Sequence, residues 1–344
     1  MSEKTAYSIA EIAKICGVSK ATVSRVINNI PQGVGPETRE KVLKTIQKLN
    51  YRPNALARSV ATSKSGSIGL IMPDVSNFFY PKIVRGVTDY MDRYGYSVIV
   101  CNSDYDPERE APQLLRLVDR RVDGILLCSG VSNKEFLADF RRYNIPLAVI
   151  GRNFDHSVID ASITGDNIQG SYKSASHLIR NGSQRVVYVE GNPDTAGAKQ
   201  RLVGYKQAHL EFGLPIREEF IISGEYSIDF GRRTAQQLLE SGLKFDAVMT
   251  GSDLIAIGIV SQFLKSGVRI PEDVEIIGFD NIELTTVFIP KLSTISKPYY
   301  NMAQHISDRL IRIIRGETIA LPHVVVEPTL VLRETTRPPV YVEA

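Results

Sequence analysis

The residues with the clearest chemical pattern lie near the start of the chain, between positions 19 and 27. Ser19 can cap a helix, and at about 100° per residue one face of that helix would carry Val23, Val26 and Ile27. The opposite face would carry Lys20, Ala21, Ser24 and Arg25. An arginine near the start of a helix can donate two hydrogen bonds to guanine in the DNA major groove. The pattern therefore predicts a helix with one core face and one free face, on which Arg25 reads a base.

Residues around Arg25 could make further contacts with DNA. Lys20 and Ala21 share its face, and we expect both to lie in the groove. The hydroxyls suited to phosphate oxygens are those of Ser19, Thr22 and Ser24. Thr22 could instead only pack inside the domain.

Two further helices are expected to hold this helix in position. Ser8 can cap a first helix, and Gly17 can end it in the left-handed conformation. Pro36 starts a third helix, whose predicted inward residues are Val42, Leu43, Ile46 and Leu49. Two short helices joined by a tight turn, followed by a third, predict a helix-turn-helix domain over residues 1–52.

The charge distribution supports a head that binds nucleic acid. Residues 1–64 hold 11 Lys and Arg against 4 Asp and Glu, a net +7, whereas the remaining residues hold 30 against 34, a net −4. A basic head on an acidic body favours a nucleic-acid partner. A small helical bundle with a solvated basic face would share both the helices and the charge.

The segment after the head is short and rich in Ala and Leu. Residues 54–61 favour a helix, but they are fewer than the ~12 residues that an isolated helix needs in water. The segment would therefore be ordered only by a partner, or it could be a plain linker. We assign residues 53–65 to this hinge and linker.

The rest of the chain alternates short apolar runs with helical stretches, and it does so in two successive series. The first series has strands expected at 67–72, 97–101, 124–128 and 147–150, and the second at 185–189, 220–222, 247–250 and 275–278. This alternation predicts an α/β core, residues 66–344, made of two doubly wound parallel-sheet subdomains.

Ligands of such sheets bind beyond the carboxyl ends of the strands, where this chain places aromatic, amide and charged residues. Those residues are Phe79, Tyr80, Arg152, Asn192, Asp253 and Asp280. Aromatic faces suit the C–H faces of a sugar, and the polar groups suit its hydroxyls. Alternatively, Asp253 and Asp280 could cap the following helices while the aromatic residues belong to the core.

Motifs of other function classes are missing from the sequence. Residues 191–200 resemble a phosphate-binding loop only superficially, because Ala196 replaces its second glycine and no hydroxyl residue follows Lys199. No catalytic elbow, metal-binding histidine spacing or apolar run of membrane-spanning length is present. We therefore expect no enzyme activity, cofactor or metal, no contact with a membrane, and a cytoplasmic, nucleoid-associated protein.

Several separated motifs resemble the LacI/GalR family of bacterial transcriptional regulators, in that family's order. They are YSIAEIAKICGVSKATVSRVIN, GPETREKVLKTIQKLNYRPNALARSVA, SIGLIMPDVSNFFYP, RVDGILL, PEDVEIIGFDNIELT and VVVEPTLVLRETT. The resemblance covers nearly the whole chain. It implies a DNA-binding head, a hinge helix and a core like the periplasmic sugar-binding proteins. That core would comprise a first subdomain of residues 66–165 and 298–323 and a second of residues 166–297 and 324–344.

The resemblance also assigns residues. Lys20, Ala21 and Arg25 match the base-reading positions of the family, and its minor-groove hinge corresponds to Asn54, Ala57 and Val60. Its effector cleft corresponds to Phe79, Tyr80, Arg152, Asn192, Arg201, Tyr226, Asp253 and Asp280. Val60 stands where the family usually has a leucine that wedges between base steps, so this chain has a shorter lever. Gly35 replaces a frequent Ser or Thr cap, a change expected to cost only a few tenths of a kcal/mol.

The function implied is a homodimeric regulator, most simply a repressor, that binds a pseudo-palindromic operator and responds to a sugar or sugar derivative. The effector could induce or corepress. One alternative is a global catabolite regulator whose core responds mainly to a phosphorylated carrier protein. Another, a sugar-binding transport receptor, would leave the basic head unexplained and would need a secretion signal.

Overall fold

Three helices form the N-terminal unit, residues 1–66: α1 (Ile9–Cys16), α2 (Lys20–Ile27) and α3 (Pro36–Lys48). The structure is a computed structural model that describes residues 7–51, 64–128, 134–151 and 155–340. Ser8 caps α1 in a reciprocal capping box with Glu11, and Gly17 ends it at φ 65°. The unit has its own core, built around Ile12, Val23 and Val42. The predicted helix-turn-helix fold is confirmed.

The prediction that Leu43 belongs to the core of this unit was wrong. Leu43 is 48% exposed, whereas its neighbour Val42 is completely buried. Adjacent helical residues lie about 100° apart, so Val42 at the centre of the inward face turns Leu43 to the side. Ile46 and Leu49 are partly buried against the same core.

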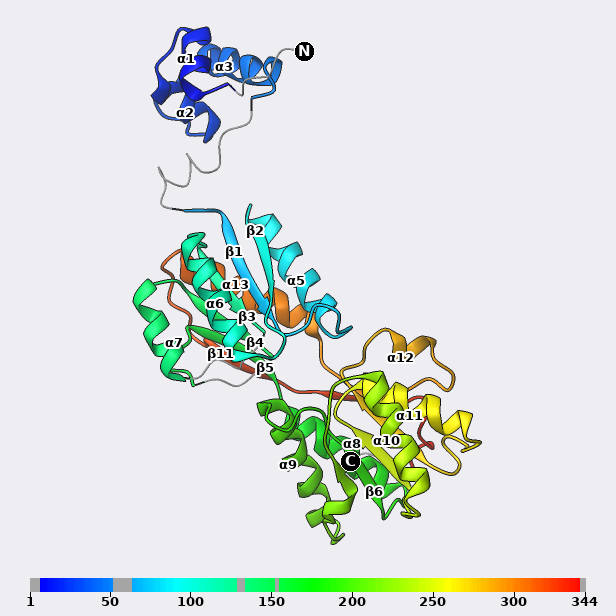
Figure 1. Cartoon of the computed structure of the whole chain (residues 1–344). Coiled ribbons are helices and arrows are strands. Elements are labelled where there is room, and N and C mark those ends of the chain that lie inside the picture. Colours follow the sequence, from blue (N-terminus) through cyan, green and yellow to red (C-terminus); the bar gives the residue numbers. More distant parts are fainter. Residues whose placement is uncertain (1–6, 52–63, 129–133, 152–154, 341–344) are drawn as a thin grey trace. The chain divides into compact units, whose positions relative to one another are not determined.

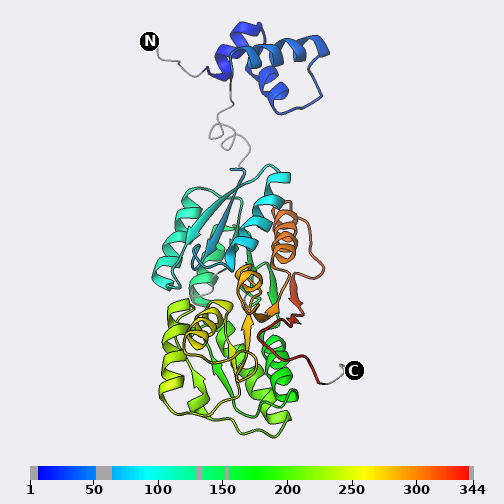
Figure 2. The same cartoon turned by 90° about the vertical axis from the view of Figure 1, so that its right-hand side faces the viewer.

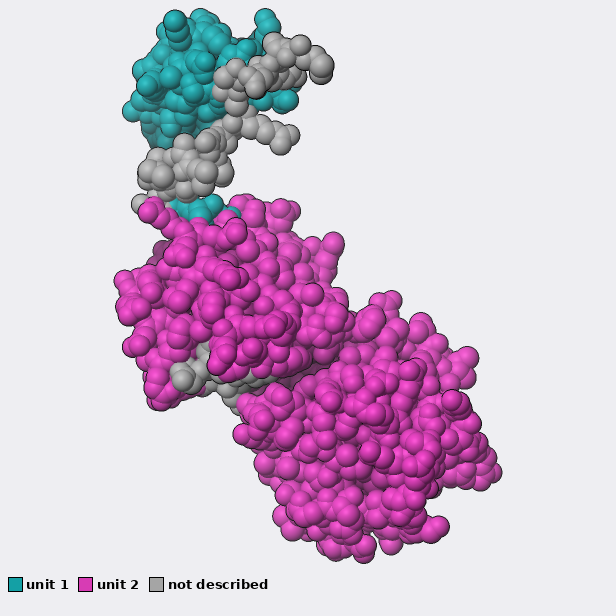
Figure 3. All heavy atoms as spheres, in the orientation of Figure 1, with its two compact units in different colours: residues 1–66 teal, residues 67–344 magenta. Residues whose placement is uncertain are grey.

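The second unit, residues 67–344, is coloured magenta in Figure 3. It is built on two six-stranded sheets, whose strands are drawn as arrows in Figure 1. The first sheet is entirely parallel, in the order β11-β5-β4-β3-β1-β2. Its strands are β1 (Ser67–Met72), β2 (Ser97–Asn102), β3 (Gly124–Leu127), β4 (Leu147–Ile150), β5 (Ala161–Gly165) and β11 (His323–Val326).

Helices cover both faces of the first sheet. One face packs against α5 (Tyr80–Arg93) and α13 (Tyr299–Ile314), which also contact each other (Figures 1 and 2). The other face packs against α6 (Pro107–Asp119) and α7 (Lys134–Phe140), the latter followed by the 3-10 turn η1 (Arg141–Tyr143). Burial on both faces explains why these strands are continuous apolar runs.

The second sheet has the order β12-β10-β9-β8-β6-β7 and is parallel except for β12, which pairs antiparallel with β10. Its strands are β6 (Val186–Val189), β7 (Ile221–Ile222), β8 (Ala247–Thr250), β9 (Glu275–Phe279), β10 (Ser293–Ser296) and β12 (Thr329–Val331). The predicted fold class, a helical N-terminal head and two parallel-sheet α/β subdomains, is confirmed.

The helices of the second sheet also form two layers. One layer is α8 (Asn167–Arg180) with α9 (Ala196–Glu211), and the other is α10 (Ile228–Glu240) with α11 (Asp253–Lys265). The shorter elements are η2 (Glu218–Phe220) and α12 (Leu284–Val287). No helix in the described ranges has the length and apolar character to span a bilayer.

The chain passes between the two sheets three times: from β5 into α8, from β10 into α13, and from β11 into β12. β11 pairs with β5 and extends to Val326, so the last passage follows residue 326 rather than residue 323. These passages bring residues distant in sequence together at the carboxyl ends of the strands.

Candidate functional site

The exposed face of α2 carries the side chains expected to contact DNA. Val23 and Val26 are buried, whereas Lys20, Ala21 and Arg25 are exposed. Nη1 of Arg25 lies 2.9 Å from the position that a Cβ of Gly33 would occupy, and Gly33 has a positive φ of 77°. Glycine at this turn therefore leaves room for the guanidinium. Arg25 forms no ion pair with a described carboxylate, so its donors are free to bind a ligand.

Three hydroxyls beside this face are placed by local hydrogen bonds. Oγ of Ser19 accepts a hydrogen bond from the backbone N–H of Thr22 at 3.0 Å and lies 2.9 Å from Oγ1 of Thr22. Oγ of Ser24 accepts a hydrogen bond from the side chain of Asn28 at 3.3 Å. The predicted hinge residues Asn54, Ala57 and Val60 lie outside the described residues.

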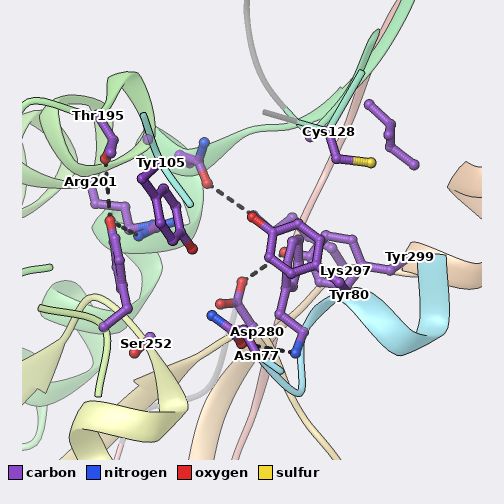
Figure 4. Close-up of a pocket in the computed structure, with 16 residues that line it drawn as sticks. Asn77, Tyr80, Tyr105, Cys128, Thr195, Arg201, Ser252, Asp280, Lys297 and Tyr299 are labelled. Carbon is purple, nitrogen blue, oxygen red and sulfur yellow. Dashed lines mark hydrogen bonds between the residues drawn. The ribbon is translucent and has the colours of Figure 1, made fainter. Parts of the chain in front are cut away.

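A cavity of about 640 Å³, which includes the solvent at its mouth, lies at the carboxyl ends of strands from both sheets (Figure 4). The first sheet and its helices contribute Asn77, Phe79, Tyr80, Tyr105, Cys128, Ile150, Gly151 and Tyr299. The second sheet and the segments that flank it contribute Asn167, Thr195, Gly197, Arg201, Tyr226, Ser252, Asp280 and Lys297. The cavity is thus a site that neither sheet could form alone.

Five of the predicted effector-site residues line this cavity: Phe79, Tyr80, Arg201, Tyr226 and Asp280. Arg152 lies outside the described residues. Asn192 is not part of the lining, and its Oδ1 accepts a hydrogen bond from the N–H of Asp194 at 2.9 Å. This local turn positions Thr195, the cap of α9.

Asp253 is completely buried behind the lining rather than in it. Its carboxylate accepts hydrogen bonds from the N–H of Ile282 at 2.8 Å and from the hydroxyl of Thr294 at 2.5 Å. Burial, together with the nearby charge of Asp280, raises the pKa of Asp253 to about 7. The alternative role predicted for Asp253 was to cap the following helix. Ser252 caps that helix, α11, instead.

Arg201 is held in the cavity by the second sheet. Its Nη1 donates to the carbonyl oxygen of Gly251 at 2.8 Å and to the hydroxyl of Tyr226 at 3.4 Å. Its Cζ lies 4.4 Å from the centre of the Phe279 ring. The buried Nε has no hydrogen-bond partner among the described residues. A bound acceptor could use this remaining donor.

Asp280 follows β9 directly and has a φ of 108°, an uncommon value for a residue other than glycine. Its Oδ1 accepts a hydrogen bond from the hydroxyl of Tyr299 at 2.7 Å. Burial and this carboxylate hold the pKa of Tyr299 well above its usual range, so the hydroxyl remains a donor. The Tyr299 ring packs edge-on against Phe79 at 4.4 Å between centroids, which ties Asp280 to the aromatic side of the cavity.

Lys297 and Asn167 are lining residues that the sequence did not predict. Nζ of Lys297 donates to Oδ1 of Asn167 at 2.9 Å, and Nδ2 of Asn167 donates to Gln200 at 2.9 Å. Burial lowers the pKa of Lys297 to about 7. Thr195, Ser252, Asn77 and Tyr105 were also missed, although each closely follows a strand or begins a helix.

The cavity therefore combines aromatic faces, hydroxyls, two amides, two basic groups and a carboxylate. This set can bind a small polar molecule through many hydrogen bonds. Among the described residues, no group of three or more His, Cys, Asp or Glu is arranged to hold a metal ion.

Comparisons with known proteins cover both units. Residues 8–54 match the model of bacterial regulatory proteins of the lacI family, and residues 65–329 match periplasmic binding proteins and the sugar binding domain of the LacI family. Catabolite control protein A of Priestia megaterium is 35% identical over 92% of this chain and 96% of that protein. The transcriptional regulator RegA of Clostridium saccharobutylicum is 36% identical over 96% and 99%.

Solved structures agree with these matches. The lac repressor dimer bound to operator and an anti-inducer has a TM-score of 0.87 and 25% identity, covering 96% of this chain and 99% of that one. A complex of the regulator CelR with cellobiose has a TM-score of 0.71 and 27% identity, with the same coverage. The chain therefore belongs to the LacI family of bacterial regulatory proteins, and it is a DNA-binding transcriptional regulator rather than an enzyme.

Proposed function

We propose that this regulator is a repressor in which α2 reads the operator and the cavity of the core binds the controlling sugar. The observation that carries the proposal is the division of α2 into a buried apolar face and an exposed face bearing Lys20, Ala21 and Arg25. An exposed basic face on a short helix of a helix-turn-helix unit is the geometry that enters the major groove.

The protein is proposed to bind DNA as a homodimer on a pseudo-palindromic site. Two copies of α2 would then contact two half-sites related by the same two-fold symmetry. The hinge residues Asn54, Ala57 and Val60 are proposed to enter the minor groove between the half-sites. An effector would change operator affinity by binding more tightly to one arrangement of the core than to the other.

A sugar is the proposed class of effector because the cavity pairs aromatic rings with converging hydrogen-bond donors and acceptors. Phe79 and Tyr226 can contact C–H faces, while Asp280 and Arg201 can bind hydroxyls. The name of one relative agrees with this class: the Ribose operon repressor of Halalkalibacterium halodurans is 32% identical over 96% of this chain. Control mainly by a phosphorylated carrier protein remains a prediction from the sequence, to be tested by pulldown from cell extract.

The test has two stages. The purified protein is first used to capture genomic DNA fragments, and the enriched site is mapped by footprinting. We expect one pseudo-palindromic footprint, and we expect Arg25→Ala to weaken it. Lys44 is an exposed α3 residue paired with Glu40, so Lys44→Ala should leave the footprint nearly unchanged. Sugars are then titrated into the complex of protein and operator. Capture of DNA without any sequence preference would contradict operator recognition, and a footprint that no sugar alters would contradict control by a sugar.

A further inference from the structure

Lys297 is the least expected residue of the cavity, because it is a buried amine with few partners. It is 7% exposed, and its Nζ has one described hydrogen-bond acceptor, Oδ1 of Asn167. Its Nζ lies 4.6 Å from the centre of the Phe279 ring and 5.4 Å from that of Tyr299. An ammonium has three donors, and rings satisfy them only weakly. The site therefore holds a cation whose hydrogen bonds are incomplete.

A second cation lies close to Lys297. Arg201 and Lys297 both lie over the Phe279 ring, so the two charges can be no further apart than the sum of their distances to its centre. Asp280 is the single carboxylate among the described lining residues, and one of its oxygens is occupied by Tyr299. The lining therefore has more basic than acidic groups.

Helix N-termini add to this positive field. The lining includes the first residue of α8, the cap and second residue of α9, and the cap of α11, which are Asn167, Thr195, Gly197 and Ser252. These three helix starts therefore border the same cavity. The start of α9 carries no carboxylate and favours an anion, whereas Asp166 caps α8 and Asp253 begins α11.

We propose that the effector is an anionic sugar, whose carboxylate or phosphate group binds between Lys297 and Arg201 while its ring lies on the aromatic residues. This inference rests on the proposed function and narrows its ligand class. A neutral sugar would leave the Lys297 ammonium without a directly bonded anion, because its described acceptor is the amide oxygen of Asn167. An anion bound among the lining residues would supply that partner.

The charges around Lys297 give the proposal a pH signature. The groups that face it are Asp280 and Asp166, which favour its protonated form, and Arg201, which opposes it. Without a ligand the pKa of Lys297 is about 7, so an anion that requires the ammonium must bind together with a proton above that pH. A sugar carboxylate stays ionised between about pH 6 and pH 8, so the titration would come from the protein.

The test measures binding of matched pairs to the full chain by calorimetry. The anionic members are glucuronate, galacturonate, glucose 6-phosphate and ribose 5-phosphate, and the neutral members are glucose, galactose and ribose. At least one anion should bind on the order of tenfold or more tightly than its neutral parent. Comparison of the carboxylates with the phosphates identifies which anion the site accepts. The dissociation constant of that anion should rise up to about tenfold per pH unit above pH 7.

Matched variants locate the effect. Lys297→Gln removes the cavity charge and should abolish both the preference for the anion and the pH dependence. Lys199→Gln removes an exposed charge from α9 and should change neither.

Two results would overturn the inference: no binding by any anionic member, or an anion preference that survives Lys297→Gln. A neutral sugar that binds and alters operator affinity would leave the proposed function standing while refuting the anionic effector.

Discussion

The exposed face of α2 and the cavity of the core use charged residues in opposite ways. On α2 the basic side chains are exposed, lie within six residues of one another and bond little to the rest of the chain. In the cavity the charges of Arg201, Asp280 and Lys297 come from distant segments and interact through shared partners. Substitutions of the exposed charges should therefore have almost additive effects on DNA binding. Substitution of one charged residue in the cavity should instead change the interactions of the residues around it.

The largest expected effect is on the free energy of unfolding and concerns Lys297 in the cavity. The pKa of Lys297 is lowered by burial to about 7, so between that pH and about 10 the unfolded chain binds more protons than the folded chain. The contribution of Lys297 to stability therefore rises with pH across this window. Lys297→Met should be more stable than the wild type by about 1 to 3 kcal/mol near pH 7, and the difference should shrink towards pH 10. Urea unfolding at several pH values measures this. A difference from the wild type that is the same at every pH would show that Lys297 keeps an ordinary pKa, as a well-solvated amine does.

On the exposed face of α2, by contrast, substitution of a basic residue should leave stability unchanged and weaken binding to DNA. Arg25→Ala should cost about 1 to 3 kcal/mol on the operator and relax specificity at one base pair of each half-site. Binding curves on the operator, on single-base variants and on random DNA measure the effect. An equal loss on specific and random DNA would identify Arg25 as a phosphate contact instead.

A smaller effect is expected from the cap of α2. Ser19→Ala removes the oxygen that accepts from the N–H of Thr22 and should destabilise the start of α2 by about 1 kcal/mol. Amide exchange of the full chain should show faster exchange in α2. Ser24→Ala is the matched control, because its hydroxyl accepts only from an exposed side chain at 3.3 Å. Equal exchange in the two variants would contradict the capping role.

The smallest effect is expected at the hinge position Val60. Val60→Leu should restore the longer wedge and tighten operator binding by a few tenths of a kcal/mol to about 1 kcal/mol, whereas Val60→Gly should weaken it. Competition binding of the three proteins to one operator resolves such differences. An affinity indifferent to both substitutions would argue against a wedge at residue 60.

Local patterns were enough to predict α2, because helix periodicity and a cap both lie within a few residues. They were also enough for Asp280, since the apolar strand β9 ends just before it. Lys297 was missed for the opposite reason: the four residues of β10 are Ser, Thr, Ile and Ser, which carry little apolar signal. Burial of these residues depends on pairing with β9 and on contacts from the C-terminal segment, as in the bond from Ser293 N–H to Thr335.

The position of Asp253 shows a second limit. The sequence places it correctly at the end of a parallel strand, but two partners far along the chain, Ile282 and Thr294, turn its carboxylate away from the cavity. Such contacts decide which of two adjacent residues, Ser252 or Asp253, lines the cavity. Strand ends therefore predict the neighbourhood of a site, whereas tertiary hydrogen bonds decide which side chain faces the ligand.

The most direct test of the account joins the two regions in one measurement. Operator affinity is measured with and without the sugar that alters the wild-type footprint, for the wild type and for Asp280→Ala and Arg201→Ala. We expect both variants to bind the operator much as the wild type does but to lose the response to the sugar, since each bond removed from the ligand is worth ~1.5 to 3 kcal/mol. A full response to the sugar in both variants would contradict the claim that this cavity controls the binding of α2 to DNA.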